Sequence, residues 1–174
     1  MKKNVCILLL VCAVCGGSCT ENTEKYLNRG ATHLDKKDYD QAIADYTEAI
    51  GLDPKSAVAY LGRGTAYFAQ RDYDQAIADL TEAIRLDPQN ARTYRFRGHL
   101  YFERKDYDRV IADCTEAISI DPHYAEAYYN RGAAYYWKDD YDKAIADLEA
   151  VLQIDPDHAG AKEAIEIAKQ ARGD

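Results

Sequence analysis

One short sequence unit repeats along most of this 174-residue chain. The dipeptide Asp-Pro recurs at a constant interval, at positions 53, 87, 121 and 155. Tyr-Asp recurs with the same period from position 39, and Arg-Gly recurs with it from position 29. Three independent dipeptides in one register indicate four copies of one supersecondary unit. Such a unit buries its apolar face only by stacking on its neighbours, so the repeat decides the fold.

Each copy reads as a pair of helices. In residues 57–90, Tyr60, Gly64 and Tyr67 recur at helical spacing on one face. A second apolar stripe follows, and Pro88 ends it because the residue before a proline is pushed out of the α region. The spacing predicts an all-α fold, with no strand beyond position 18. Helix breaks are expected near residues 37–38, 53–56, 71–72, 87–90, 105–106, 121–124, 139–140 and 155–158.

These units resemble the tetratricopeptide repeat family. In the second copy the family's signature spacing is occupied by Tyr60, Gly64, Tyr67, Ala76, Leu80, Ala83 and Pro88. The resemblance covers residues 23–156 and implies a right-handed solenoid of antiparallel helix pairs, whose concave groove binds peptides or proteins. The four repeats would be residues 23–56, 57–90, 91–124 and 125–158. Residues 159–172 carry an apolar stripe opposite a polar face, which predicts a capping helix.

Differences between the copies predict where a partner binds. Every copy must fold alike, so positions that vary are free to set specificity. The second helices barely vary, whereas the first helices vary at a few positions that share one face. All three phenylalanines and the single tryptophan of the chain fall at these positions. The predicted groove residues are Leu61, Phe68, Arg92, Arg95, Phe96, His99, Phe102, Tyr129, Asn130, Tyr136 and Trp137.

Two interpretations of these groove positions remain open. The aromatic residues would line an apolar groove for a partner segment, or they would simply pack neighbouring repeats together. Arg92, Arg95 and His99 form the basic cluster of the groove, suited to a carboxylate of the ligand. A small apolar ligand in the same groove is the alternative to a protein or peptide partner.

The second helices carry a recurring aspartate, as in Asp45, and further acidic residues such as Glu48. We expect these positions to form an acidic, solvated convex side. The same aspartates also match the recurring arginine before each glycine, as Asp45 matches Arg29. Guanidinium and carboxylate groups suit bidentate contact, so a structural Arg–Asp ladder is predicted.

Residues 1–18 have the layout of a secretory signal peptide. Two lysines precede eleven apolar residues, Val5 to Cys15, and small residues follow. This run is about half of the ~20 residues that a membrane-spanning helix needs. Cys19 comes directly after the small residues, which resembles the lipobox of bacterial lipoproteins, although Gly16 stands where that family usually has leucine. In that family the cysteine is lipidated and becomes the mature N-terminus.

The leader therefore predicts an exported, membrane-anchored lipoprotein on the periplasmic or outer face, with lipid on Cys19. Release as a soluble secreted or periplasmic protein is the alternative. Residues 19–22 would form a short extended tether before a first helix that starts near residue 23.

Other functional classes find little support in the sequence. The net charge of −8 opposes binding to nucleic acid, which needs a surplus of Lys and Arg. The four histidines lack partners at catalytic spacing, and the chain has no phosphate-binding Gly-rich loop and no zinc or disulfide pattern. We expect a non-enzymatic scaffold, without cofactor or metal, that binds a protein or peptide segment. The alternative is a carrier or sensor of a small apolar ligand.

Overall fold

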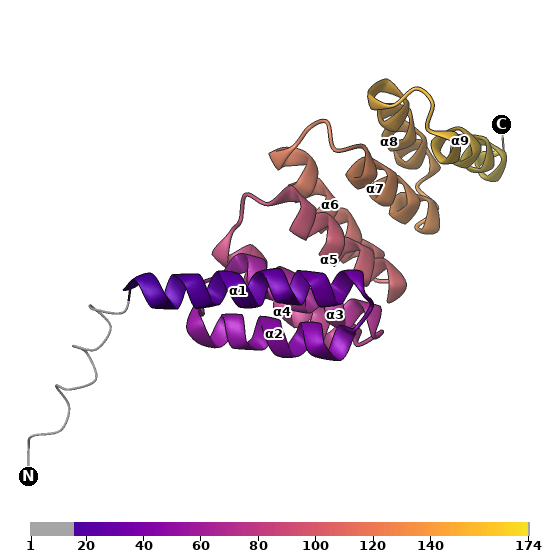
Figure 1. The fold of residues 1–174 in the computed structure, drawn as a ribbon. Helices are drawn as coiled ribbons and strands as arrows, with labels where there is room; N and C mark the ends of the chain where they lie inside the picture. The colour runs from indigo at the N-terminus through magenta and orange to yellow at the C-terminus, as the bar shows by residue number, and fades with distance from the viewer. Residues whose placement is uncertain (1–15, 174) are drawn as a thin grey trace, which may run out of the picture. The chain divides into compact units, whose positions relative to one another are not determined.

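The computed structural model describes residues 16–173 of the chain, which form nine α-helices and no strand (Figure 1). The described helices fall into two compact units that divide between Leu86 and Asp87. Unit 1 holds α1 (Gly16–Asp35), α2 (Tyr39–Leu52), α3 (Ala57–Ala69) and α4 (Tyr73–Leu86). Unit 2 holds α5 (Ala91–Glu103), α6 (Tyr107–Ile120), α7 (Ala125–Trp137), α8 (Tyr141–Ile154) and α9 (Ala159–Arg172). The predicted all-α fold class and the predicted helix breaks are confirmed.

Two kinds of turn separate the helices. Inside each helix pair, one residue of the turn takes the left-handed conformation, which costs energy in any residue but glycine. These residues are Lys37, Arg71, Lys105 and Asp139, with φ between 59° and 65°. Between pairs, the aspartate before each proline leaves the helix and its carboxylate accepts a hydrogen bond from the amide two residues on. In the first such turn, Lys55 N lies 3.0 Å from Asp53 Oδ1.

The first helix begins earlier than expected. We predicted an extended tether at residues 19–22, but α1 begins at Gly16 and continues without interruption to Asp35. The reason is local, because no proline or glycine between residues 18 and 29 interrupts the hydrogen-bonding ladder. Residues 1–15 of the predicted signal peptide lie outside the described residues. Lipidation of Cys19 and removal of the leader stay predictions.

In unit 1, each helix packs on the next, and Tyr46 fills the space between three of them. This tyrosine is 4% exposed. A Cβ atom added at Gly30 of α1 would lie 3.0 Å from its ring, and one added at Gly62 of α3 would overlap it. In α6 of unit 2 the equivalent residue is Cys114, a smaller buried side chain with a free thiol. Desolvation by burial raises the pKa of Cys114 to about 12.

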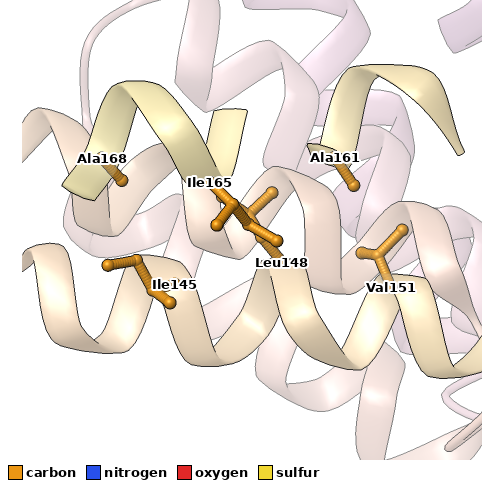
Figure 2. Close-up of a cluster of buried hydrophobic side chains, with 6 residues drawn as sticks. All are labelled: Ile145, Leu148, Val151, Ala161, Ile165 and Ala168. Atoms are coloured by element: carbon orange, nitrogen blue, oxygen red, sulfur yellow. The ribbon is translucent and has the colours of Figure 1, made fainter. Parts of the chain in front are cut away.

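In unit 2, the last helix is held on α8 by an apolar cluster (Figure 2). The cluster comprises Ile145, Leu148 and Val151 of α8 with Ala161, Ile165 and Ala168 of α9. Ala161 and Ala168 stand one repeat period after Ala127 and Ala134, and all four are buried. The capping helix therefore occupies the place of a first helix of a fifth pair.

Polar contacts confirm this register of the capping helix. A residue at the C-terminal end of α3, of α7 and of α9 reaches the first turn of the preceding second helix, 30 residues back. Gln70 donates to Asp40 over 2.6 Å, and Arg172 at the end of α9 donates to Asp142 over 2.6 Å. Lys138 pairs in the same way with Asp108.

The predicted Arg–Asp ladder is confirmed in all four helix pairs. The arginine of each first helix makes two hydrogen bonds to the aspartate of the second: Arg29 with Asp45, Arg63 with Asp79, Arg97 with Asp113 and Arg131 with Asp147. In the last pair both N–O distances are 2.8 Å, and the bonds from Asp147 raise the pKa of the Arg131 guanidinium. The same guanidinium donates to Thr115 of α6 over 3.1 Å and lies over the ring of Tyr128.

The ladder corrects one expectation about the acidic residues. We expected the recurring aspartates to belong to a solvated convex side, but all four are at most 7% exposed. They turn inward because each meets a guanidinium, and a buried carboxylate needs such a partner. Glutamates such as Glu48, Glu116 and Glu149 are exposed, as expected of a solvated face.

Candidate binding face of unit 2

An apolar pocket lies between α7 and the capping helix α9. Its volume is about 140 Å³. Its floor includes Leu148 of α8. Trp137 and Ile167 also line the pocket, although 59% of Trp137 and 45% of Ile167 is exposed to solvent. The full lining is Tyr129, Gly132, Ala133, Tyr136, Trp137, Leu148, Ala164 and Ile167. Because large apolar side chains are normally covered, this combination of pocket and exposed residues marks a candidate binding site.

Aromatic contacts hold the pocket wall in place. Trp137 stacks on Tyr107 of α6, with ring centroids 6.3 Å apart and planes 6° from parallel. Tyr136 meets Trp137 edge to face at 5.9 Å and also contacts Tyr141 of α8. One face of the indole is therefore fixed by the protein while much of the side chain remains exposed. A rigid aromatic group of this kind binds a partner at low entropic cost.

Other predicted aromatic residues pack within their own helix pair. Phe102 lies edge to face on Tyr107 at 5.6 Å, and in unit 1 Phe68 stacks on Tyr73 at 6.0 Å. Both phenylalanines are half-buried. At these two positions the packing interpretation describes the contacts, whereas Trp137 is exposed as the groove interpretation requires.

The basic cluster differs from the expected arrangement. Arg92 is exposed in the first turn of α5, and His99 is half-buried further along the same helix. Arg95 donates its Nε–H to the hydroxyl of Tyr124 over 2.7 Å, so the residue before α7 holds this guanidinium. The sequence does contain a sign of this contact, in the residue type at one helix-capping position. Tyr124 stands at a helix-capping position where the other copies have Ser56, Asn90 and His158.

One variable position is explained by packing. Gly62, Phe96 and Asn130 are equivalent residues of successive first helices. Glycine is required at position 62 because Tyr46 occupies the space, so its variation does not indicate specificity. Asn130 and Phe96 are half-buried, and the Nδ2 of Asn130 is buried without a hydrogen-bond partner among the described residues.

The structure brings some of the predicted groove residues together. Tyr129, Tyr136 and Trp137 meet at the pocket, and Tyr129 also lies 5.3 Å from the ring of His158. Leu61 and Phe68 belong to unit 1 and are not among the residues that line this pocket.

Sequence reasoning missed the contribution of the capping helix. Ala164 and Ile167 of α9 line the pocket, although the capping helix lacks the repeat signature. The available signal was the register, because Ile167 follows Ala133 by one repeat period, at a variable position of the first helices.

Metal sites and membrane spans have no candidates within residues 16–173. No cluster of three or more His, Cys, Asp or Glu residues there is arranged to hold a metal ion. None of the described helices combines the length and the apolar character that crossing a membrane requires.

The helix pairs, the Arg–Asp ladder and the capping helix define an all-α repeat protein. Profiles of the tetratricopeptide repeat match residues 27–91, 61–125 and 125–158. The chain belongs to the tetratricopeptide repeat family. A search of curated proteins found no match.

Solved structures of this family resemble the chain closely. The crystal structure of MamA protein is 29% identical, with a TM-score of 0.83 over 88% of this chain and 84% of that chain. The first TPR domain of Spaghetti (RPAP3), bound to the HSP90 peptide SRMEEVD, is 30% identical, with a TM-score of 0.67 over 70% of this chain and 97% of that chain. YrrB, a TPR protein with an unusual peptide-binding site, shares the fold at 22% identity and a TM-score of 0.75, over 84% of this chain and 76% of that chain.

Proposed function

We propose that this protein is a non-enzymatic scaffold that binds a segment of a partner protein on the α5, α7 and α9 face of unit 2. The α7–α9 pocket carries the proposal, because it is apolar and flanked by the exposed side chains of Trp137 and Ile167. One bulky apolar side chain of the partner would enter the pocket and act as the anchor of the interface.

The size of the pocket favours a protein segment over a small apolar ligand. Sites for small molecules usually enclose about 300–1,000 Å³. The α7–α9 pocket has about 140 Å³, close to the ~150 Å³ of a cavity that takes one benzene ring. That volume suits a single aromatic or branched aliphatic side chain. The peptide-bound RPAP3 domain, at 30% identity, supports the same class of partner.

We further propose that the protein is exported and tethered to a membrane. The support is the leader sequence, with its two lysines, its apolar run and Cys19 after the small residues. Metabolic labelling with palmitate tests the anchor. Label on the wild-type chain that is lost in Cys19→Ser is expected, and label that persists in that variant contradicts lipidation at Cys19.

Peptide selection tests the binding face. A random peptide library is selected on the purified full chain, and enriched peptides are then measured against Ile167→Glu by fluorescence anisotropy. We expect enriched peptides to share a bulky apolar residue and to lose at least about tenfold in affinity, since a carboxylate would enter an apolar pocket. Val58→Glu is the matched control, because Val58 is an exposed apolar residue of unit 1.

Two results would decide against the proposal. If the peptides bound Ile167→Glu and Val58→Glu with equal affinity, the α7–α9 pocket would not be their binding site. An apolar small molecule that stays bound to the purified chain in native mass spectrometry, and that Ile167→Glu releases, would favour the ligand carrier instead.

A further inference from the structure

The turn between α2 and α3 exposes two large apolar side chains. Within the described residues, four large apolar side chains are exposed, and two of them belong to the α7–α9 pocket. The other two are Leu52, at 36% exposed, and Val58, at 63%. They flank the turn on either side, and we call residues 51–58 the α2–α3 corner. Nothing in the proposed binding face of unit 2 uses this corner.

The α2–α3 corner lies beside the start of α1. A cleft of about 470 Å³ separates the corner from the first turns of α1, with Thr20 on one side and Leu52 on the other. Cys19, the residue proposed to carry the lipid, directly precedes Thr20 in α1. The proposed lipid anchor is therefore attached to the fold close to this corner.

Comparison between repeats shows that an apolar residue recurs at position 52, as Leu86, Ile120 and Ile154, whereas the scaffold does not require one at position 58. Where the corner has Val58, the first copy has Glu24, the third has Arg92 and the fourth has Glu126. All four copies form the same turn, so the large apolar side chain at position 58 is particular to the corner nearest the start of α1.

We propose that the α2–α3 corner rests on the lipid surface to which the chain is tethered. Val58 and Leu52 would enter the boundary between headgroups and acyl chains, where exposed apolar residues are favourable. Lys55, between them, has a long side chain whose ammonium group can stay among the headgroups. This inference rests on the proposed tether and adds which face of unit 1 the membrane covers.

Charge and size argue for a lipid surface as the occupant. Glu24 and Asp53 line the cleft with Leu52, and Lys55 is the one basic residue of the corner, so the corner has no basic cluster that would select anionic lipid. A second copy of the chain is a poorer occupant, because stable protein interfaces bury about 1,200–2,000 Å² in total. Two aliphatic side chains supply far less than that area.

Quenching of tryptophan by brominated lipid tests the contact. The wild-type chain has one tryptophan, Trp137, which lies in unit 2 and serves as the control. The test variant combines Trp137→Phe with Val58→Trp, which moves the single tryptophan to the corner. Both full chains are bound to phosphatidylcholine vesicles with and without bromine on the acyl chains, and binding is checked by co-flotation. We expect the loss of fluorescence at position 58 to exceed that of Trp137 at least about twofold.

The outcomes separate the contact from the tether. Co-flotation with equal quenching at both positions overturns the membrane contact and leaves the tether standing. Failure to float with vesicles overturns the tether and the contact together. Sedimentation that shows a dimer, dissociated by Val58→Glu, with no excess quenching at position 58 assigns the corner to a second copy and overturns the proposal. A second variant, Leu52→Trp in the Trp137→Phe background, must show the same excess quenching.

Discussion

Replacing Arg131 by methionine should destabilise the protein more than the same change at Arg29. Methionine keeps much of the length of arginine and removes the charge. In α7, Arg131 donates twice to Asp147, contacts Thr115 of α6, and has only 18% of its side chain exposed. In α1, the side chain of Arg29 is 49% exposed, and His33 Nε2 lies 3.7 Å from the same carboxylate of Asp45.

The size of each loss in stability depends on the surroundings of the aspartate that is left without its arginine. Arg131→Met removes the cation from Asp147, a residue that is only 7% exposed in the wild-type fold. Breaking a buried ion pair in this way costs about 3–5 kcal/mol, and we take the lower end, about 3 kcal/mol, because Arg131 is not fully covered. Asp45 is itself buried, at 2% exposed, but after Arg29→Met His33 stays within 3.7 Å of its carboxylate and water can enter where the half-exposed guanidinium stood. The loss should therefore be less than half as large.

Urea unfolding followed by far-UV circular dichroism measures both losses. Because repeat proteins can open locally, native-state hydrogen exchange should also place the extra loss of Arg131→Met in α7 and α8. Each change affects one of four equivalent pairs, so each variant is the control for the other. Equal losses in free energy of unfolding, or a larger loss at Arg29, would refute the reasoning from burial.

Three further predictions follow from single positions. Gly62→Ala should lower the free energy of unfolding by about 1–3 kcal/mol, because its Cβ overlaps the ring of Tyr46. Tyr46→Leu should cancel that effect of Gly62→Ala in a double-mutant cycle, and Gly51→Ala, with open space around it, should not destabilise. Lys105→Gly should raise the free energy of unfolding in urea by about 0.5–1 kcal/mol. The reason is that glycine adopts the left-handed φ of 59° without strain, and this gain outweighs the added freedom of the unfolded chain. A lower free energy of unfolding would contradict this. Cys114 holds its proton in the fold up to a pKa of about 12, against 9.0 ordinarily, so the thiol favours folding below pH 9 and this contribution is lost as the pH rises towards 12. The stability difference between wild type and Cys114→Ala should shrink over that range, and a constant difference would argue against the raised pKa.

The sequence predicted the features of this fold that recur. Helix breaks were predictable because each copy repeats Asp-Pro between helix pairs and an aspartate before Tyr-Asp within a pair. The pairing of Arg131 with Asp147 was predictable because the same two residue types recur in all four copies. The start of α1 at Gly16 was not, since a helix that continues through residues without breakers gives no local sign of where it begins.

The candidate site was less predictable because it depends on contacts between different copies. The reason for glycine at position 62 lies in Tyr46, which belongs to the preceding helix pair. Arg95 is held by Tyr124, which belongs to the next pair. Ile167 reaches the pocket from a helix without the repeat signature. Each of these needs the packing of one repeat on another, which the pattern within a repeat does not contain.

The capping helix has a consequence for how such an array changes length. At two positions α9 differs from a first helix that pairs with a following second helix. Ile165 stands where α7 has Arg131, and Glu166 stands where α7 has Gly132. In α7 the glycine lets the second helix approach, since a Cβ there would lie 3.2 Å from the carbonyl oxygen of Ala144. The face of α9 that packs on α8 keeps the ordinary register, so duplication of one whole repeat in the gene upstream of α9 would present the same docking surface. Growth of the array and its termination are thus encoded in one helix, because Ala161, Ile165 and Ala168 pack on α8 while Glu166 replaces the glycine that a following second helix needs. Evolution can alter the number of repeats without redesigning the end.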